Sequence, residues 1–233
     1  MTSLTAPGRL ADDPVYGACL FVVIDFEGTT PAGAPPEPTE VAALALRHRP
    51  GRGPWPTGWQ FQALIKPPAH AVITEADVRQ TGITPAMVAT APPAREMLHR
   101  LETTLPITDG EDGGGVLLVA HHASVEANFL DRYRTACPRL ARTRLIDTRL
   151  LARHLLPDAP SYTLDALLHA AGIGRPADRH RALPDVAVTA ELFAHLLTVA
   201  ASTRHVRCMA DLLRIAARTP RSARPTQLSL THS

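Results

Sequence analysis

The sequence predicts an α/β fold in which a mixed β-sheet is flanked by α-helices. Short apolar runs at residues 21–24 (FVVI), 116–120 (VLLVA) and 145–147 (LID) are typical of strands that are buried on both faces. Helical patterns follow the second and the third run, as they do where helices connect the strands of a sheet. No internal repeat is visible, and the 233 residues are enough for one domain with a sizeable core.

The first part of the chain is predicted to contain a flexible leader and then a meander of strands. Residues 1–18 are assigned to the leader because they combine Pro, Gly and adjacent acids. The Pro-rich residues 31–38 cannot form a helix or a central strand. Further strands are expected at residues 41–47 and 59–65, on either side of a Gly- and Pro-rich connection at residues 50–58.

Helices are predicted to dominate from Thr74 onward. The first helical pattern is broken at residues 81–85 (TGITP), and residues 109–115 are expected to be a flexible, acidic and glycine-rich turn. Thr163 can cap a helix that Gly172 ends. The helices are expected at residues 94–104, 125–136, 148–156, 164–171, 185–200 and 205–218.

The domain limits follow from these elements. Residues 19–202 are assigned to one folded domain, and residues 203–218 to a C-terminal helix. Residues 219–233 are rich in Arg, Pro, Ser and Thr and are expected to be a disordered tail.

The composition is compatible with a nucleic-acid substrate without requiring one. The net charge of +2 and the pI near 8.6 are too weak to indicate a polyanionic partner. Lys66 is the only lysine, and arginine suits bidentate contact with phosphate better than lysine does. GC-rich codon usage would also favour arginine over lysine, so this bias alone does not indicate a nucleic-acid substrate. The arginines at residues 132–153 and 204–224 could contact a phosphate backbone, but most of them are expected to lie on solvated helix faces.

The cysteine pattern and the N-terminal residues predict a cytoplasmic protein. Cys19, Cys137 and Cys208 are scattered and lack CxxC spacing, so neither a disulfide framework nor a structural zinc site is indicated. Residues 1–18 lack the basic start and the apolar centre of a signal peptide. No apolar run is expected to span a membrane.

Two carboxylates at the end of the first strand are the first candidate functional residues. Asp25 and Glu27 directly follow the apolar run at residues 21–24. Side chains at positions i and i+2 of a strand point the same way, so both carboxylates should face one site. Two like charges held together are costly unless a cation or a shared proton offsets them, which favours a divalent metal. The alternative is a strand end whose acids point into water.

Two further groups of titratable residues stand at the ends of predicted elements. Glu126 lies in the first turn of the helix after the strand at residues 116–120, with His122 four residues before it. The helix dipole favours a carboxylate there in any case, and the two residues could also share a face as metal ligands. Asp185 opens the last long helix and follows His180. Alternatively, Asp185 is only an acid at the start of a helix and His180 only a loop histidine.

Together these motifs resemble those of the DEDDh class of 3′ to 5′ exonucleases, the DnaQ-like superfamily that includes the epsilon proofreading subunit, ribonuclease T and oligoribonuclease. The first motif of that class, a strand ending in Asp-x-Glu followed by threonines, is matched by residues 25–30 (DFEGTT). The second is matched by residues 120–126 (AHHASVE), and the third, His-x4-Asp, by residues 180–185 (HRALPD). The Asp147-Thr148 pair before a helix also falls in the expected order. Ordered agreement of several motifs is more specific than any single match.

The resemblance implies a ribonuclease H-like mixed sheet flanked by helices, and a metal-dependent nuclease site. In such a site two Mg2+ or Mn2+ ions are held by carboxylates, and a histidine takes the proton of the attacking water. The matching metal ligands are Asp25, Glu27, Glu126 and Asp185, and the matching proton acceptor is His180.

The resemblance also implies a substrate and partners. The 3′ end of single-stranded DNA or RNA would be hydrolysed to nucleoside 5′-monophosphates. Gly28, Thr29, Thr30 and His122 would lie beside the terminal nucleotide. A polymerase or another protein acting in trans and a second copy of the chain are compatible partners, and no membrane is expected.

Four positions depart from the family pattern. Glu126 replaces an aspartate, His122 an asparagine and Val125 a phenylalanine, and Gly28 stands where the first threonine is usual. A glutamate reaches one methylene farther than an aspartate. The missing ring removes a stacking surface worth about 1–3 kcal/mol. The alternative interpretation is therefore a nucleic-acid-binding module that keeps the fold with weakened catalysis.

Overall fold

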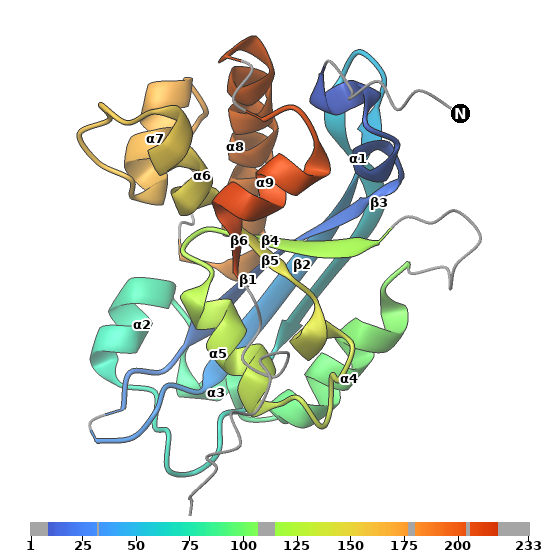
Figure 1. Cartoon of the computed structure of the whole chain (residues 1–233). Helices are drawn as coiled ribbons and strands as arrows, with labels where there is room; N and C mark the ends of the chain where they lie inside the picture. Colours follow the sequence, from blue (N-terminus) through green and yellow to red (C-terminus); the bar gives the residue numbers. More distant parts are fainter. Residues whose placement is uncertain (1–8, 32, 107–114, 177–179, 204–205, 219–233) are drawn as a thin grey trace, which may run out of the picture.

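The computed structural model describes residues 9–31, 33–106, 115–176, 180–203 and 206–218 (Figure 1). These residues form a six-stranded mixed sheet with the strand order β3-β2-β1-β4-β5-β6, flanked by helices. The predicted mixed β-sheet flanked by α-helices is confirmed.

Strand β1 (Leu20–Gly28) lies in the middle of the sheet. It pairs antiparallel with β2 (Pro38–Arg49), which pairs antiparallel with the edge strand β3 (Gly53–Leu64). On its other side β1 pairs parallel with β4 (Val116–Ala120), and β4 pairs parallel with β5 (Leu145–Asp147). The carboxyl ends of three parallel strands therefore meet at one edge of the sheet, where sites in α/β proteins usually lie.

Helices cover both faces of the sheet (Figure 1). One face packs against α1 (Pro14–Ala18), α6 (Thr148–Leu155), α7 (Leu164–Ala171), α8 (Ala182–Thr203) and α9 (Met209–Ala216). The other packs against α4 (Ala94–Thr104), α5 (Ser124–Arg132) and the 3-10 turn η2 (Leu140–Arg142). The short helices α2 (Glu75–Thr81) and α3 (Pro85–Val88) surround a third, small apolar cluster.

The side chains of β1 alternate between these two layers. Phe21 and Val23 join the core that contains α6 and α8, whereas Val22, Ile24 and Phe26 join the core that contains α4 and α5. The predicted burial of this strand on both faces is confirmed. The odd-numbered face, which faces α8, is the one that continues to the two carboxylates at the end of the strand.

Local sequence signals set several helix ends as predicted. Thr74 caps α2 through a capping box with Asp77, and Gly82 ends that helix in the left-handed conformation with a φ of 70°. The Thr163 hydroxyl accepts a hydrogen bond from a backbone amide in the first turn of α7, and Gly172 ends it with a φ of 67°.

The first three strands are longer than the sequence predicts, and the helix that follows β4 is shorter. β2 extends beyond the predicted residues 41–47 at both ends. β1 continues through Gly28, so Asp25 and Glu27 lie within the strand rather than after it. β3 starts before the predicted residue 59, with two prolines among its first four residues. Prolines are tolerated there because β3 is an edge strand, where a missing N–H need not remove a ladder hydrogen bond. The helix predicted at residues 125–136 is limited to α5.

Both ends of the described chain differ from the prediction. The 3-10 turn η1 (Leu10–Asp12) and α1 occupy part of the expected leader, and Leu10 and Tyr16 join the core. The helix predicted at residues 205–218 is limited to α9, because the chain then forms β6 (Ala217–Arg218), which pairs antiparallel with β5. The glycine-rich turn and the tail fall largely outside the described residues, and the domain limits stay a prediction.

Helix α8 corrects the expectation that no apolar run has the length of a membrane span. It has 22 residues and a mean hydropathy of 1.5 over its most apolar window, which is enough by length and composition to cross a membrane. Half of that window is buried inside the protein. The helix is apolar on several sides because its residues pack between the sheet and the helices α6 and α7.

Candidate active site

β1 delivers two carboxylates to a cavity at the carboxyl end of the parallel strands. Asp25 is partly exposed, whereas Glu27 is 7% exposed. The pairing of β1 with β2 shifts register between Glu27 and Gly28, a bulge that locally increases the twist of the strand. Both carboxylates line the cavity, as the i, i+2 relation predicts.

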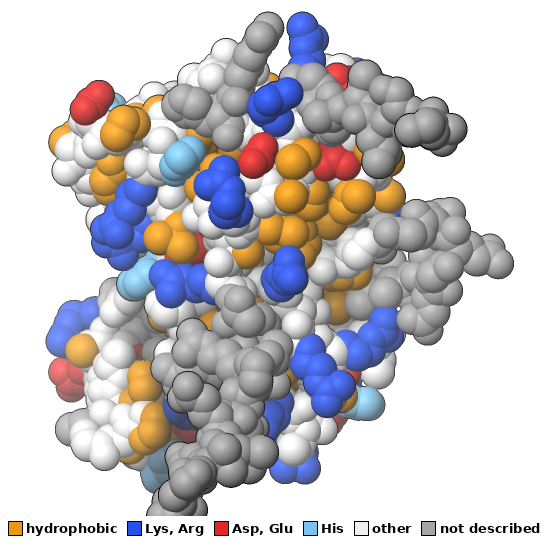
Figure 2. Space-filling view, viewed as in Figure 1, with side chains coloured by type: hydrophobic (Ala, Val, Ile, Leu, Met, Phe, Trp, Pro, Cys, Tyr) orange, Lys and Arg blue, Asp and Glu red, His pale blue; other side chains and the backbone are white. Residues whose placement is uncertain are grey.

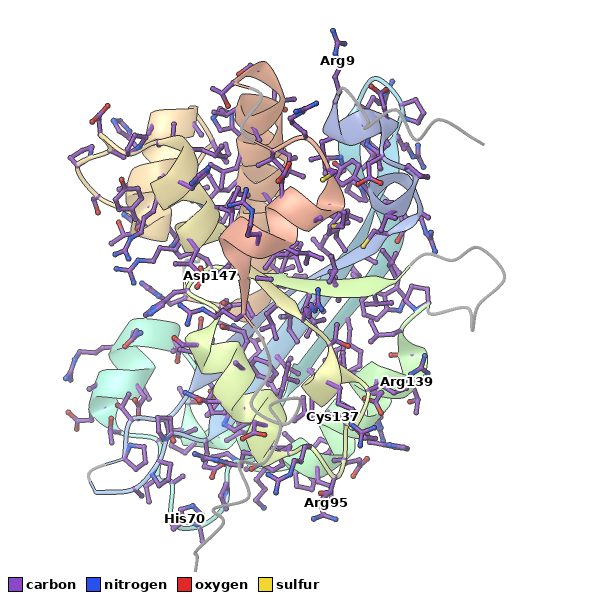
Figure 3. All side chains as sticks on the ribbon, viewed as in Figure 1. Arg9, His70, Arg95, Cys137, Arg139 and Asp147 are labelled. Carbon is purple, nitrogen blue, oxygen red and sulfur yellow. The ribbon has the colours of Figure 1, made fainter. Side chains whose placement is uncertain are left out.

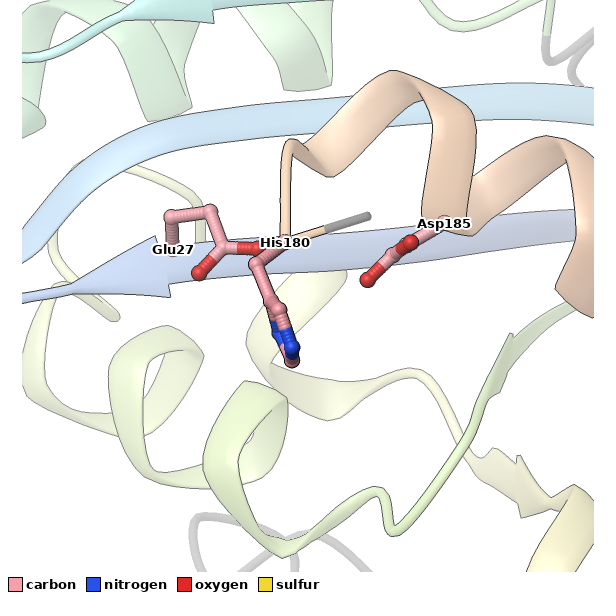
Figure 4. Close-up of side chains that lie close together, drawn as sticks. All are labelled: Glu27, His180 and Asp185. Carbon is pink, nitrogen blue, oxygen red and sulfur yellow. The ribbon is translucent and has the colours of Figure 1, made fainter. Parts of the chain in front are cut away.

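The start of α8 brings His180 and Asp185 to the same cavity. Glu27, His180 and Asp185 each place one potential ligand atom within 4.8 Å of the other two, which makes them a candidate cation site among the described residues (Figure 4). Asp185 is only 6% exposed. His180 has a φ of 67°, a left-handed conformation that non-glycine residues adopt only where the surroundings fix it.

A buried ion pair fixes the chain at this point. Glu40 of β2 is 0% exposed, and its Oε2 accepts hydrogen bonds from Arg181 Nε at 2.9 Å and from the Ala182 amide at 3.0 Å. Its Oε1 accepts from a terminal Arg181 nitrogen at 2.7 Å and from Gln62 at 2.9 Å. Burial raises the pKa of Glu40, but these hydrogen bonds outweigh it and hold the pKa below its usual value. Sequence reasoning misses this pair, although a glutamate inside an apolar strand is a signal for it.

Glu126 enters the cavity from α5. It is 3% exposed, and its Oε2 is buried without a hydrogen-bond partner among the described residues. Burial raises the pKa of Glu126 to about 8, and the negative charges of Asp147 and Glu27 add to the effect. A buried carboxylate oxygen without a partner costs free energy, which a positive charge at this point would relieve.

One cavity of about 400 Å³ gathers all five residues that the sequence predicts to be catalytic. They come from β1, α5 and the start of α8, three places far apart in the chain. Asp25 and Glu126 line the cavity without belonging to the close group of Glu27, His180 and Asp185. The remaining lining residues are Phe26, Gln80, His121, His122, Val125, Arg149, Tyr162, Thr163 and Leu164.

These residues fit a divalent cation. Carboxylate oxygens are the ligands that Mg2+ and Mn2+ prefer in proteins. Glu27 and Asp185 are too buried to be strand-end and helix-end acids that simply point into water. The like charges held within 4.8 Å and the partnerless oxygen of Glu126 are what a bound cation would offset.

Of the residues predicted to bind the terminal nucleotide, His122 lines the cavity, whereas Gly28, Thr29 and Thr30 are not among its lining residues. His122 is exposed and lines the cavity, with a φ of 62°. Thr29 is 1% exposed, and its Oγ1 accepts from the Glu37 amide at 3.2 Å. Thr30 Oγ1 donates to Asp77 Oδ1 at 2.5 Å. Neither threonine is among the residues that line the cavity, and their role in substrate binding stays a prediction.

Gly28 is a packing position, and replacing it by alanine is expected to destabilise the protein by about 1–3 kcal/mol. A Cβ there would lie 3.0 Å from Phe129 Cζ and 3.2 Å from the carbonyl oxygen of Glu37. The check is urea unfolding of Gly28→Ala, Phe129→Leu and the double variant. The double variant should lose less stability than the sum of the single changes, and strictly additive losses would contradict this packing.

Asp147 supports the cavity from the end of β5. It is 0% exposed, and its Oδ1 accepts from the amides of His122 at 3.1 Å and Arg149 at 3.0 Å. Its Oδ2 accepts from Arg218 Nε at 2.8 Å. Figure 3 shows Asp147 near the middle of the molecule, between the two groups of helices. The carboxylate thus ties together the turn after β4, the start of α6 and β6, a role that the sequence does not reveal.

His121 is expected to make the folded state sensitive to acid. Burial lowers its pKa to about 4, and its Nδ1 lies 2.9 Å from Thr148 Oγ1. Folding therefore favours the neutral ring, so this contribution to stability is complete above pH 6.5 and is lost as the pH falls toward about 4. The difference between the pKa of 6.5 and the lowered pKa of about 4 corresponds to at most about 3 kcal/mol of free energy of unfolding. Thermal unfolding across this pH range should show a flatter decline for His121→Gln than for the parent, and parallel curves would contradict the assignment.

Comparison with known proteins identifies the family. The model of the Exonuclease family, RNase_T, matches residues 22–193, which run from β1 into α8. A DNA polymerase III subunit epsilon-like protein of Rhodobacter capsulatus is 35% identical over 191 residues, covering 81% of this chain and 25% of the relative. A PolC-type DNA polymerase III of Thermotoga maritima is 33% identical over 189 residues, covering 79% of this chain and 12% of the relative. The chain thus spans a quarter or less of these two relatives.

Shorter relatives and solved structures agree with this match. A DNA polymerase III subunit epsilon of Aquifex aeolicus is 30% identical over 178 residues, covering 76% of this chain and 80% of the relative. The nuclease domain of 3′hExo, a DEDDh family member bound to rAMP, has a TM-score of 0.67 at 19% identity, covering 81% of this chain and 96% of that one. Exonuclease X in complex with 5′ overhanging duplex DNA has a TM-score of 0.55 at 24% identity, covering 82% and 98%. At such identities the structures show a shared fold.

The family model covers most of the chain, and Asp25, Glu27, Glu126, His180 and Asp185 line one cavity. Members of the DEDDh group use divalent metal ions, for which the cavity offers suitable ligands. The chain belongs to the Exonuclease family, within the DnaQ-like DEDDh superfamily.

Proposed function

We propose that the chain is a 3′ to 5′ exonuclease that hydrolyses the ends of single-stranded DNA or RNA to nucleoside 5′-monophosphates. The observation that carries the proposal is the close group of Glu27, His180 and Asp185, in a cavity that also holds Asp25 and Glu126. Hydrolysis of an anionic phosphodiester needs stabilisation of charge and a proton acceptor, and this set of side chains suits both needs.

Asp25, Glu27, Glu126 and Asp185 are assigned to hold two Mg2+ or Mn2+ ions. When bound, such ions stabilise the charge that develops on the attacking and leaving oxygens. Support comes from the burial of Glu27, Glu126 and Asp185 together in one cavity, which without a cation leaves like charges close to one another.

His180 is assigned to take the proton of the attacking water. Histidine is the side chain that changes charge most readily near neutral pH. Arg181, the residue after His180, is held by its ion pair with Glu40. This pair therefore keeps the His180 imidazole beside Glu27 and Asp185. The 3′ oxygen of the penultimate nucleotide would be the leaving group.

Terminal-nucleotide binding is assigned to the rim of the cavity. His122 and Val125 are exposed there, and Val125 also lines a neighbouring groove of about 510 Å³ with Phe129. An aliphatic side chain offers no stacking surface, so the contact with the terminal base is expected to be weak.

Association with a DNA polymerase in trans is a further part of the proposal. Its support is the similarity to an epsilon-like protein and to an epsilon subunit of DNA polymerase III. Pairing of two copies of the chain and a cytoplasmic location stay predictions from the sequence.

The second candidate function is a nucleic-acid-binding module with weakened catalysis. Glu126 favours it, because the residue departs from the family aspartate and its Oε2 lacks a partner among the described residues. A binding module does not require a histidine beside four carboxylates, which favours the enzyme. Metal-dependent turnover separates the two.

Direction of attack is tested with two 5′-labelled single strands, one with a free 3′ hydroxyl and one with a blocked 3′ end. With Mg2+, the first strand should be shortened stepwise while the label stays on the shortened product, and the blocked strand should persist. Early release of a labelled mononucleotide would mean attack from the 5′ end. The same comparison with RNA and with a dinucleotide establishes the preferred substrate.

A further inference from the structure

One arginine stands out by its surroundings. On the face shown in Figure 2, the Lys and Arg side chains occupy separate positions rather than one continuous patch. Arg181 and Arg218 pair with the buried carboxylates Glu40 and Asp147. Arg149 instead is partly buried and lines the candidate catalytic cavity. Its Nε is buried without a hydrogen-bond partner, and within the part of the chain that the structure describes its side chain has no ion pair with a carboxylate.

The backbone of Arg149 is held firmly although its side chain is not. Its amide donates to Asp147 Oδ1 at 3.0 Å, in the first turn of α6, and the same oxygen accepts from the His122 amide at 3.1 Å. Asp147 is in turn fixed by Arg218 at 2.8 Å. A permanent positive charge is therefore anchored on a rigid element at the wall of a cavity that also holds four carboxylates.

A guanidinium group that lines a cavity without an ion pair to a described carboxylate leaves its positive charge for an anionic group of a ligand. The guanidinium group is the side chain best matched to phosphate oxygens, which it binds by two parallel hydrogen bonds. The carboxylates and the cations they would hold account for the phosphate that is cleaved. Arg149 lies outside the cluster of Glu27, His180 and Asp185. The anion that it would contact is therefore a second phosphate of the substrate, not the one that is cleaved.

We propose that Arg149 binds a backbone phosphate of the substrate strand next to the phosphodiester that is cleaved, an inference that rests on the proposed function. Phosphate contacts of this kind fix the register of a strand and carry no base preference. Arg149 is then a positioning residue that makes the enzyme favour a strand over an isolated phosphodiester. The contact should act mainly on KM, because it forms before the chemical step and persists through it.

The proposal is tested with two substrates that differ in the second phosphate. A single-stranded DNA oligonucleotide contains it, and the p-nitrophenyl ester of thymidine 5′-monophosphate has only one phosphodiester. For Arg149→Gln, KM for the oligonucleotide should rise at least about tenfold, and the ratio of kcat/KM for the oligonucleotide to that for the ester should fall by the same factor. Arg149→Lys should recover part of the loss.

Arg95→Gln is the matched control, because it removes the same charge from an exposed position on α4 that Figure 3 shows far from Asp147. Both kinetic constants should stay at the parent values in this variant. Equal losses on both substrates for Arg149→Gln would overturn the inference, since Arg149 would then act on the cleaved phosphate or on the carboxylates.

A binding measurement separates this inference from the proposed function. Fluorescence anisotropy with a 5′-labelled oligonucleotide in EDTA, over a range of salt, gives the slope of log K against log salt concentration. The slope should be shallower by about 0.7 for Arg149→Gln and unchanged for Arg95→Gln. A parent protein that cleaves neither substrate would refute the proposed function while this slope still tests Arg149. An unchanged slope for Arg149→Gln would refute the phosphate contact.

Discussion

Replacing Asp25 by alanine is expected to lower the rate of nucleotide release from a single strand by at least about a thousandfold. Asp25 lies on the central strand and lines the cavity beside Glu27 and Asp185. Asp25 would be one of the carboxylates that hold the cations, and its removal would weaken the stabilisation of charge that they supply. The measurement is single-turnover cleavage of a 5′-labelled strand in Mg2+.

The control for this prediction is Asp158→Ala. Asp158 is an exposed carboxylate between α6 and α7, outside the residues that line the cavity. It should leave the rate unchanged, and both variants should melt cooperatively as the parent does. If Asp25→Ala folds and still cleaves at the parent rate, the proposed catalytic site is wrong.

Substitution of Glu126 is expected to have the second-largest effect on the cleavage rate, and two different substitutions should have opposite outcomes. Glu126→Gln should lose about a hundredfold in rate, because an amide cannot supply the charge of a ligand and misplacement of a reacting group near 1 Å costs a similar factor. Glu126→Asp should preserve or raise the rate, because it restores the residue usual in the family. A loss above about tenfold for Glu126→Asp would mean that the site is adapted to glutamate.

Thermal unfolding gives an independent check on Glu126. Without metal, Glu126→Gln should be at least as stable as the parent, because a neutral amide replaces a carboxyl group that burial holds at a pKa of about 8. Mg2+ should raise the Tm of the parent more than that of the variant, since ligand binding stabilises the state that binds it. Equal increases in Tm would remove Glu126 from the cation site.

The parts of the fold that local patterns encode could be predicted from the sequence. The apolar run before Asp25 identifies a strand buried on both faces, and the Thr163 and Gly172 signals set the ends of α7. The meeting of Asp25, Glu27, Glu126, His180 and Asp185 in one cavity was predictable because three motifs in the right order resemble a known family.

The supporting interactions could not be predicted, because they join residues far apart in the chain. Glu40 and Arg181 are separated by 141 positions, and Asp147 and Arg218 by 71. No local periodicity relates such residues, and Arg218 reaches Asp147 only because β6 pairs with β5. Thr29 and Thr30 show the reverse case. They lie two and three positions after Glu27, yet the Thr29 hydroxyl accepts a hydrogen bond from the Glu37 amide and the Thr30 hydroxyl donates one to the Asp77 carboxylate.

The most direct test of the account is the chemical identity of the first product released from a single strand in Mg2+ and 18O-labelled water. The account predicts a nucleoside 5′-monophosphate that carries one 18O in its phosphate, together with a strand one nucleotide shorter that ends in a 3′ hydroxyl. Mass spectrometry distinguishes these products from the alternatives. A nucleoside 3′-monophosphate, a released oligonucleotide, or a 5′-monophosphate without the label would contradict the proposed hydrolysis.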